Sequence, residues 1–202
     1  MKNYLFLALI LAFGGCAHDA AYNPNSVFVQ SDEDIRANKP FESAVIYTRS
    51  EILRSMNLKP STRLGNDESI DINLGEFAVQ STKSVLSNYL RNITTTTKAD
   101  ALQTGLVIMP DIRAFEYGFY SYDGMDLDID PYVLYDFRMS IFKNGKEIYN
   151  KKLSIDEKVK GERVFFGGGK IAFASIAPLF QKALVDDLKK HENEIISAIN
   201  NN

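Results

Sequence analysis

The chain has 202 residues, with 23 lysines and arginines against 26 aspartates and glutamates, for a formal net charge of −3. Hydrophobic residues make up 45% and charged residues 24% of it, which is typical of a folded domain that buries one core. No run of basic residues is present, so we expect no nucleic-acid partner. One cysteine and two histidines are a poor ligand set, so we also expect no metal or other cofactor.

The first sixteen residues have the order of a secretory signal peptide. Lys2 supplies a positive charge, residues 4–13 (YLFLALILAF) are apolar, and Gly14 and Gly15 precede Cys16. Ten residues rise about 15 Å as a helix, about half of the hydrocarbon core, so this run is too short to span a membrane.

Cys16 behind two small residues resembles the lipobox of bacterial lipoproteins, although Phe13 and Gly14 depart from the usual Leu and Ala or Ser. The resemblance implies that residues 1–15 are cleaved off and that Cys16 carries a diacylglyceryl group, usually with an acyl group such as palmitate on its amine. Ala17 in place of Asp implies the outer membrane, with the body facing the periplasm; the inner membrane and the cell surface are the alternatives. An ordinary signal peptide followed by an unmodified cysteine, or a buried N-terminal helix, also remains open.

Residues 16–40 are polar, contain two prolines and include an acidic run at 32–34. This composition predicts a flexible tether that holds a single domain, residues 41–202, tens of ångströms away from the membrane.

The domain begins with short β-rich segments. Ser43–Thr48 predicts a strand, and Glu68–Leu74 predicts a second, because its apolar residues alternate with polar ones. Lys59–Asp67 between them has the composition of a loop. Glu76–Asn92 carries an apolar stripe at helical spacing, which predicts a helix that ends before the threonine run 94–97.

A β region and a final helix follow. Leu106–Met109 predicts a strand that Pro110 restricts to a sheet edge or a bulge, and Ile112–Tyr122 continues it. Tyr132–Phe142 predicts a clear strand, joined at the turn Asn144-Gly145 to a partner strand over Lys146–Ile155. Residues 157–170 are glycine-rich and predict a mobile segment. From about Ser175 to residue 199, an apolar stripe predicts the C-terminal helix.

This order of elements predicts an α+β fold. We expect a two-layer sandwich in which two helices pack on one face of a mixed, mostly antiparallel sheet.

No pattern of residues indicates catalysis. The carboxylates between Asp123 and Asp130 lack the glycine and the final glutamate of a calcium-binding EF-hand loop. Residues 167–170 (GGGK) lack the rest of a phosphate-binding loop, and no GxSxG motif is present. We therefore expect a protein that is not an enzyme.

Aromatic residues are dense between positions 115 and 137. They either fill the core of a domain without tryptophan or form, in part, an exposed groove for an acyl chain or a partner protein. Those flanking the acidic loop are the best candidates for exposure. The candidate partner surface is Tyr120, Tyr122, Asp126, Asp128, Asp130 and Tyr132.

The segment ending at Cys16, the strand over Val133–Phe142, the turn Asn144-Gly145 and the helix over Ile176–Leu188 together resemble small bacterial envelope lipoproteins. Two groups are similar in this order of elements: YajG-like lipoproteins and the auxiliary lipoproteins of lipid-transporting ABC systems. The resemblance implies a lipid-anchored accessory module in lipid or glycolipid traffic or envelope maintenance, with an envelope protein or an ABC transport component as partner. The alternative is a structural scaffold or adhesin that acts through protein contacts.

Overall fold

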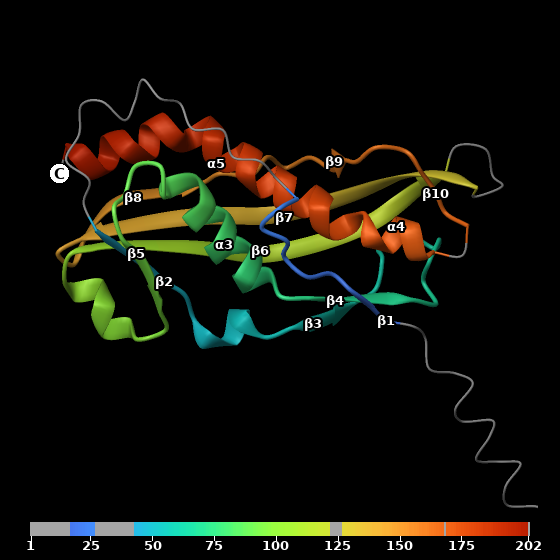
Figure 1. Ribbon diagram of the computed structural model, residues 1–202, viewed down its shortest axis with the longest axis horizontal. Coiled ribbons are helices and arrows are strands. Elements are labelled where there is room, and N and C mark those ends of the chain that lie inside the picture. Colours follow the sequence, from blue (N-terminus) through green and yellow to red (C-terminus); the bar gives the residue numbers. More distant parts are fainter. Residues whose placement is uncertain (1–16, 27–42, 122–126, 168, 202) are drawn as a thin grey trace, which may run out of the picture.

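The computed structural model describes residues 17–26, 43–121, 127–167 and 169–201. Two long helices lie on one face of a large mixed sheet, and a smaller sheet adjoins one end of this sandwich (Figure 1). The predicted α+β class and two-layer arrangement are confirmed.

The large sheet has seven strands. In the order β10-β7-β6-β2-β5, β2 is parallel to both β5 and β6, and the other pairs are antiparallel; β8 and β9 also pair with β7. The strands are β2 (Ala44–Tyr47), β5 (Ile93–Thr96), β6 (Leu106–Ser121), β7 (Asp128–Lys143), β8 (Lys146–Lys152), β9 (Val159–Lys160) and β10 (Val164–Phe165).

Strand β7 follows its sequence pattern closely. Its alternate residues Val133, Phe137 and Ile141 are buried in the core, as their spacing predicts. The turn to β8 places Asn144 at φ 52° and Gly145 at φ 80°, the two positive values that a type I′ turn requires. The predicted hairpin is confirmed.

Pro110 lies inside β6 without breaking it. Strand β2 pairs with β6 only as far as Ile108, so Pro110 lies where β6 has become an edge strand on that side. A bulge follows between Ile112 and Ala114. An edge position is where a residue without an N–H donor is tolerated, as the sequence predicts.

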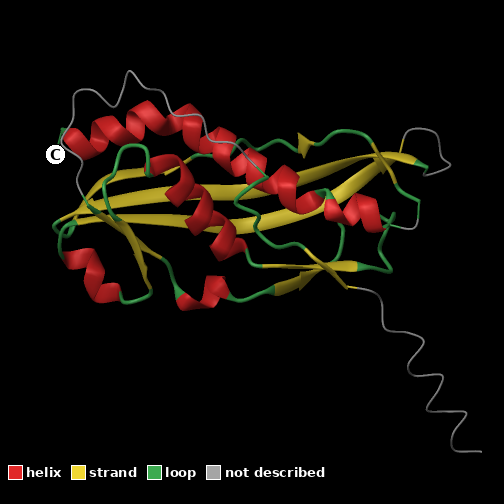
Figure 2. Ribbon diagram, in the orientation of Figure 1, coloured by secondary structure: helices red, strands yellow, loops and turns green. Residues whose placement is uncertain are grey.

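The two long helices lie over β6 and β7 and contact each other (Figure 2). Both bury apolar residues at these contacts. The Asn73 side chain caps the first long helix by accepting a 3.0 Å hydrogen bond from the Glu76 N–H. This helix ends at Leu86, earlier than predicted. The β-branched run that was expected only to end the helix forms a strand of its own, β5. The helices are α3 (Leu74–Leu86), α4 (Lys170–Ala174) and α5 (Ile176–Asn200), with 3-10 turns η2 (Ser50–Leu53) and η3 (Ala99–Gln103).

The small sheet corrects the first part of the predicted tether, whereas residues 27–40 of it lie outside the described residues. Strand β4 (Ser69–Ile72) pairs with β3 (Met56–Leu58) on one side and with β1 (Ala17–Asp19) on the other. After β1, Ala20 is buried and Tyr22 packs edge-on against Phe77 at 5.6 Å between ring centroids. Residues 17–23 are therefore part of the folded body. Their polar composition was misleading because backbone pairing and two side chains, buried Ala20 and half-buried Tyr22, hold the stretch in place.

The segment 157–170 is also more ordered than predicted. β9 pairs with Tyr132 and Val133, and β10 pairs with Asp128 and Ile129, so two short parts of this stretch form a border on β7. Strands of two residues are too short to show an alternation of apolar and polar side chains, so the sequence does not reveal them. They are defined by their backbone pairing with β7.

Candidate functional site

Strand β1 fixes where the N-terminal segment joins the domain. Ala17 is paired with Ser69, and the His18 ring stacks on Phe173 of α4 at 4.6 Å and contacts the Glu68 carboxylate. Cys16 itself lies outside the described residues. Its neighbour Ala17 nevertheless lies at the end of the molecule formed by β1, the loop 59–68, β10 and α4 (Figure 1), which we call the anchor end.

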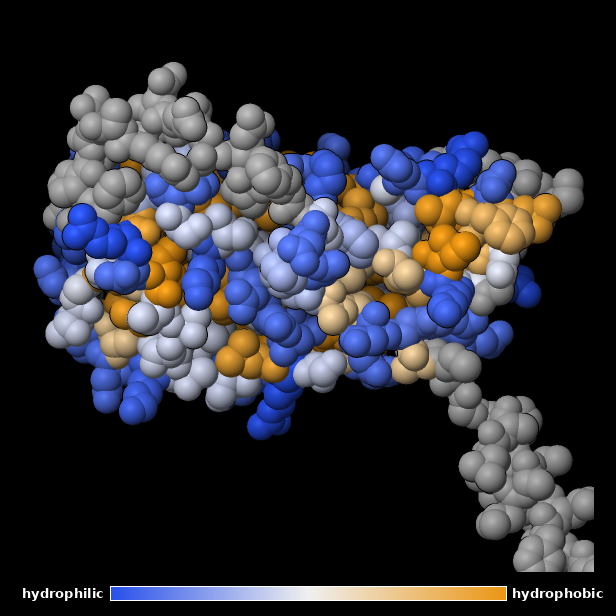
Figure 3. Space-filling view, viewed as in Figure 1, coloured by the Kyte–Doolittle hydropathy of each residue, from blue (hydrophilic) through white to orange (hydrophobic). Residues whose placement is uncertain are grey.

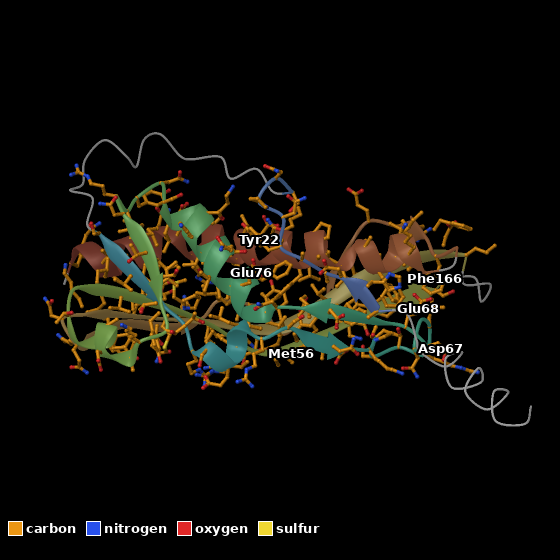
Figure 4. All side chains as sticks on the ribbon, turned by 60° about the horizontal axis from the view of Figure 1, so that its bottom comes forward. Tyr22, Met56, Asp67, Glu68, Glu76 and Phe166 are labelled. Carbon is orange, nitrogen blue, oxygen red and sulfur yellow. The ribbon has the colours of Figure 1, made fainter. Side chains whose placement is uncertain are left out.

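A groove of about 650 Å³ opens at the anchor end. The carboxylates of Asp67 and Glu68 lie close to Phe166 there, at the same end as β1 (Figure 4). About half of the groove lining is polar and the other half is apolar or glycine. The polar residues are Thr62, Arg63, Asp67 and Glu68, and the apolar ones are Leu64, Phe119 and Phe166, with Gly65 between the two sets.

The loop that forms this groove is held against β6 by hydrogen bonds. Ser61 N–H donates to the Tyr117 carbonyl at 2.8 Å, and Phe119 N–H donates to Thr62 Oγ1 at 3.2 Å. Gly65 has φ +75°, and a Cβ there would lie 3.0 Å from the Phe173 ring. The loop is therefore pre-formed, and glycine allows it to approach the aromatic core closely.

Exposed apolar side chains gather at the same end. Ile171 is 59% exposed, Phe165 53% and Leu127 49%, and Phe166 N–H donates to the Leu127 carbonyl at 2.8 Å. Figure 3 shows hydrophobic surface over α4 and β10. Three of the five large apolar residues that are exposed in the described part of the chain thus belong to this one end.

The predicted partner surface is only partly formed. Tyr122 and Asp126 lie outside the described residues, Tyr120 is half-buried and Asp128 is exposed. Tyr132 is 1% exposed, so its predicted exposure is wrong. The reason is β9, which pairs along Tyr132 and brings the Lys158 ammonium to 4.1 Å from the centre of its ring.

Other contacts around Tyr132 strengthen this correction. Its hydroxyl is 2.7 Å from Ser61 Oγ, and Tyr120 packs on its ring at 4.8 Å. Asp130 is largely covered and bonds to Arg163 at 3.1 Å. Most of the remaining aromatic cluster is core, as one of the two interpretations predicts.

A second groove, of about 590 Å³, lies between α3 and the ends of β2 and β5. Leu53, Glu76 and Thr48 are among its lining residues. The Thr48 hydroxyl is buried, and it has no hydrogen-bond partner among the described residues. This groove lies away from the anchor end, as the position of Glu76 in Figure 4 shows.

Tyr135 and Asp187 form a partly buried hydrogen-bonded pair between β7 and α5. Tyr135 Oη donates to Asp187 Oδ2 at 2.7 Å on the buried side of α5. Burial, together with the charge of Asp187, raises the pKa of Tyr135, and burial raises the pKa of Asp187. Among the described residues, no three His, Cys, Asp or Glu side chains are grouped so that they would hold a metal ion, and no helix is long and apolar enough to cross a membrane.

Sequence reasoning missed the anchor end. The loop 59–68 was predicted as a loop, but nothing in its composition indicates a groove. One signal was available: the segment VFFGGGKI places exposed apolar residues on both sides of three glycines. Glycine-flanked aromatics in a surface segment are a reason to test for an interaction surface.

No protein-family model and no curated protein matches this sequence. Among solved structures, the chain is similar to the crystal structure of protein XCC0632 from Xanthomonas campestris, a protein assigned to the family model DUF330. The TM-score is 0.46 at 10% sequence identity, and the match covers 84% of this chain and 88% of that chain. At this level the likeness assigns neither a family nor a function.

Proposed function

We propose that this protein is a lipid-anchored, non-enzymatic accessory module of the bacterial envelope that binds a lipid or glycolipid at the anchor end. The observation that carries the proposal is the position of the groove. It opens beside β1, whose first residue directly follows Cys16 of the lipobox-like segment. An anchor on Cys16 would therefore bring the groove to the membrane.

The lining of the groove suits an amphiphile. Its volume of about 650 Å³ is within the roughly 300–1,000 Å³ typical of small-molecule sites. Leu64, Phe119 and Phe166 offer apolar contacts, whereas the Arg63 and Glu68 side chains offer hydrogen bonds to a polar headgroup. In contrast, the helix–sheet interface holds buried core side chains such as Phe180 and Leu188, so we place the ligand in the groove at the anchor end.

The lipidated N-terminus also bears on the cellular location of the protein and on its partner. Ala17 after Cys16 favours the outer membrane, with the domain facing the periplasm. A kinship with the auxiliary lipoproteins of lipid-transporting ABC systems would make an envelope protein or an ABC transport component the partner.

Native mass spectrometry of the fragment Ala17–Asn202 tests the binding function. We expect co-purified lipid on the wild-type fragment, and we expect Leu64→Glu to abolish it by placing a charge in the groove. Leu53→Glu, the same change at a half-buried leucine in the second groove, is the matched control and should keep the lipid. A lipid-free fragment of defined oligomeric state would contradict the proposal and favour a scaffold.

A further inference from the structure

We infer that the anchor end is itself a membrane-contact face, on which Leu127, Phe165 and Ile171 enter the outer part of the bilayer beside the acyl chains on Cys16. The inference rests on the lipid anchor proposed above. It adds a statement that the anchor alone does not make: the domain lies directly on the membrane in one orientation instead of moving at the end of a tether.

Almost no free chain separates Cys16 from the folded body. Residue 17 already pairs in a sheet, and successive Cα atoms are about 3.8 Å apart. A lipid on Cys16 would thus be one residue away from β1. Because His18 is stacked on Phe173 and Ala20 is buried, this attachment point is firmly joined to α4 and the core.

The surface at this end of the molecule is apolar at three exposed positions. Isolated apolar side chains are common on any surface, but neighbouring ones beside a lipidation site are a specific arrangement. Leu127 directly precedes β7, Phe165 belongs to β10 and Ile171 belongs to α4. Figure 3 shows that the hydrophobic surface over β10 and α4 lies at the end of the molecule. Apolar faces that lie in the membrane interface enter it by about 5–10 Å, which is within reach of single side chains.

The charges nearby decide which membrane suits the face. Exposed Arg63 and Lys170 are basic, but exposed Asp67 and Asp128 are acidic. The surface is therefore not strongly cationic, and attraction to anionic lipids contributes little to membrane binding. The favourable free energy of binding has to come from insertion of the apolar side chains. A zwitterionic bilayer is the occupant that matches this chemistry.

This orientation would give a membrane lipid direct access to the groove. Phe166 lines the groove and packs on Phe119 at 5.8 Å, while its neighbour Phe165 points outward. With Phe165 in the bilayer, the groove would open at the membrane surface. A lipid would then enter it without crossing water.

Depth-dependent quenching tests this orientation. Cys16 is the only cysteine, and lipidation turns its thiol into a thioether, so an introduced cysteine is the only free thiol. We suggest Phe165→Cys and Ile171→Cys, with Lys146→Cys as an exposed control. The control follows β7, whose 16 residues separate the two ends by about 50 Å. Each full-length lipidated variant is labelled with the fluorophore NBD and reconstituted in phosphatidylcholine–phosphatidylethanolamine vesicles containing nitroxide lipid.

We expect the probes at 165 and 171 to shift to the blue and to be quenched several-fold more than the probe at 146. Equal quenching at all three positions would overturn the inference. A blue shift without quenching by the nitroxide lipid would also overturn it, because protein would then cover the face. If the wild-type chain itself takes up the label, Cys16 is free, and the proposed anchor fails together with this inference.

Discussion

Phe173→Ala is the substitution that most directly tests how β1 is held on the domain. Phe173 is 1% exposed, and its ring contacts His18 of β1 at 4.6 Å and Phe119 of β6 at 5.1 Å. Truncation of a buried phenylalanine to alanine costs about 3–5 kcal/mol in the free energy of unfolding. At about 2–4 °C per kcal/mol for a domain of this size, the melting temperature should fall by about 6–20 °C.

Urea unfolding of the fragment from Ala17 measures this loss, and hydrogen exchange locates it. The Ala20 N–H donates to the Asp71 carbonyl at 3.0 Å, so its protection reports on the docking of the N-terminal strand. Phe165→Ala is the matched control, because this phenylalanine is at the same end but 53% exposed. A loss below about 1 kcal/mol for Phe173→Ala, or equal to that of the control, would refute the packing described for α4 and β1.

Two further predictions concern pH and close packing. Burial raises the pKa of Asp187, so its favourable contribution is complete below the unfolded value of about 3.9 and is lost as the pH rises through the raised value. Asp187→Asn should therefore gain stability relative to wild type between pH 4 and 7, as followed by urea midpoints; a constant difference would contradict the burial of this carboxylate. Gly75→Ala should cost about 1–3 kcal/mol, because its Cβ would lie 2.4 Å from the Ile52 carbonyl oxygen. Calorimetry that shows unchanged or higher stability would mean that the gain in helix propensity outweighs this contact.

Much of the fold could be predicted from local patterns. The alternation in β7, the Asn144-Gly145 turn and the apolar stripe of α5 are short-range signals, and all three are confirmed. Such signals are strong where one face of a long element is buried and the other meets solvent.

The elements that were missed depend on partners far away in the sequence. Strand β1 exists because Ala17 pairs with Ser69, and β5 exists because Ile93–Thr96 runs parallel to β2. β1 is short and β5 is almost all threonine, so neither shows the apolar alternation that identified the similarly short β2 and β4. The pairing partners of β1 and β5 supply most of their stability.

The candidate site was harder to predict than the fold. The aromatic residues near the acidic loop suggested a surface, but β9 covers Tyr132, and sequence alone does not show which strand borders another. The groove depends on Gly65 bringing a polar loop over Phe173 and on the contact between Phe119 and Phe166. These are tertiary contacts with no local signal.

The central claim is that Cys16 becomes the lipidated N-terminus and so sets the groove at the membrane. Mass spectrometry of the N-terminal peptide from membrane-extracted protein tests it, with Cys16→Ser as the comparison. We predict that the wild-type peptide begins at Cys16 with a diacylglyceryl group and an amide-linked acyl chain, and that the variant stays as uncut precursor and leaves the membrane fraction. An unmodified residue at the N-terminus of the wild-type chain, or a Cys16→Ser variant that still matures and partitions into detergent, would contradict the claim.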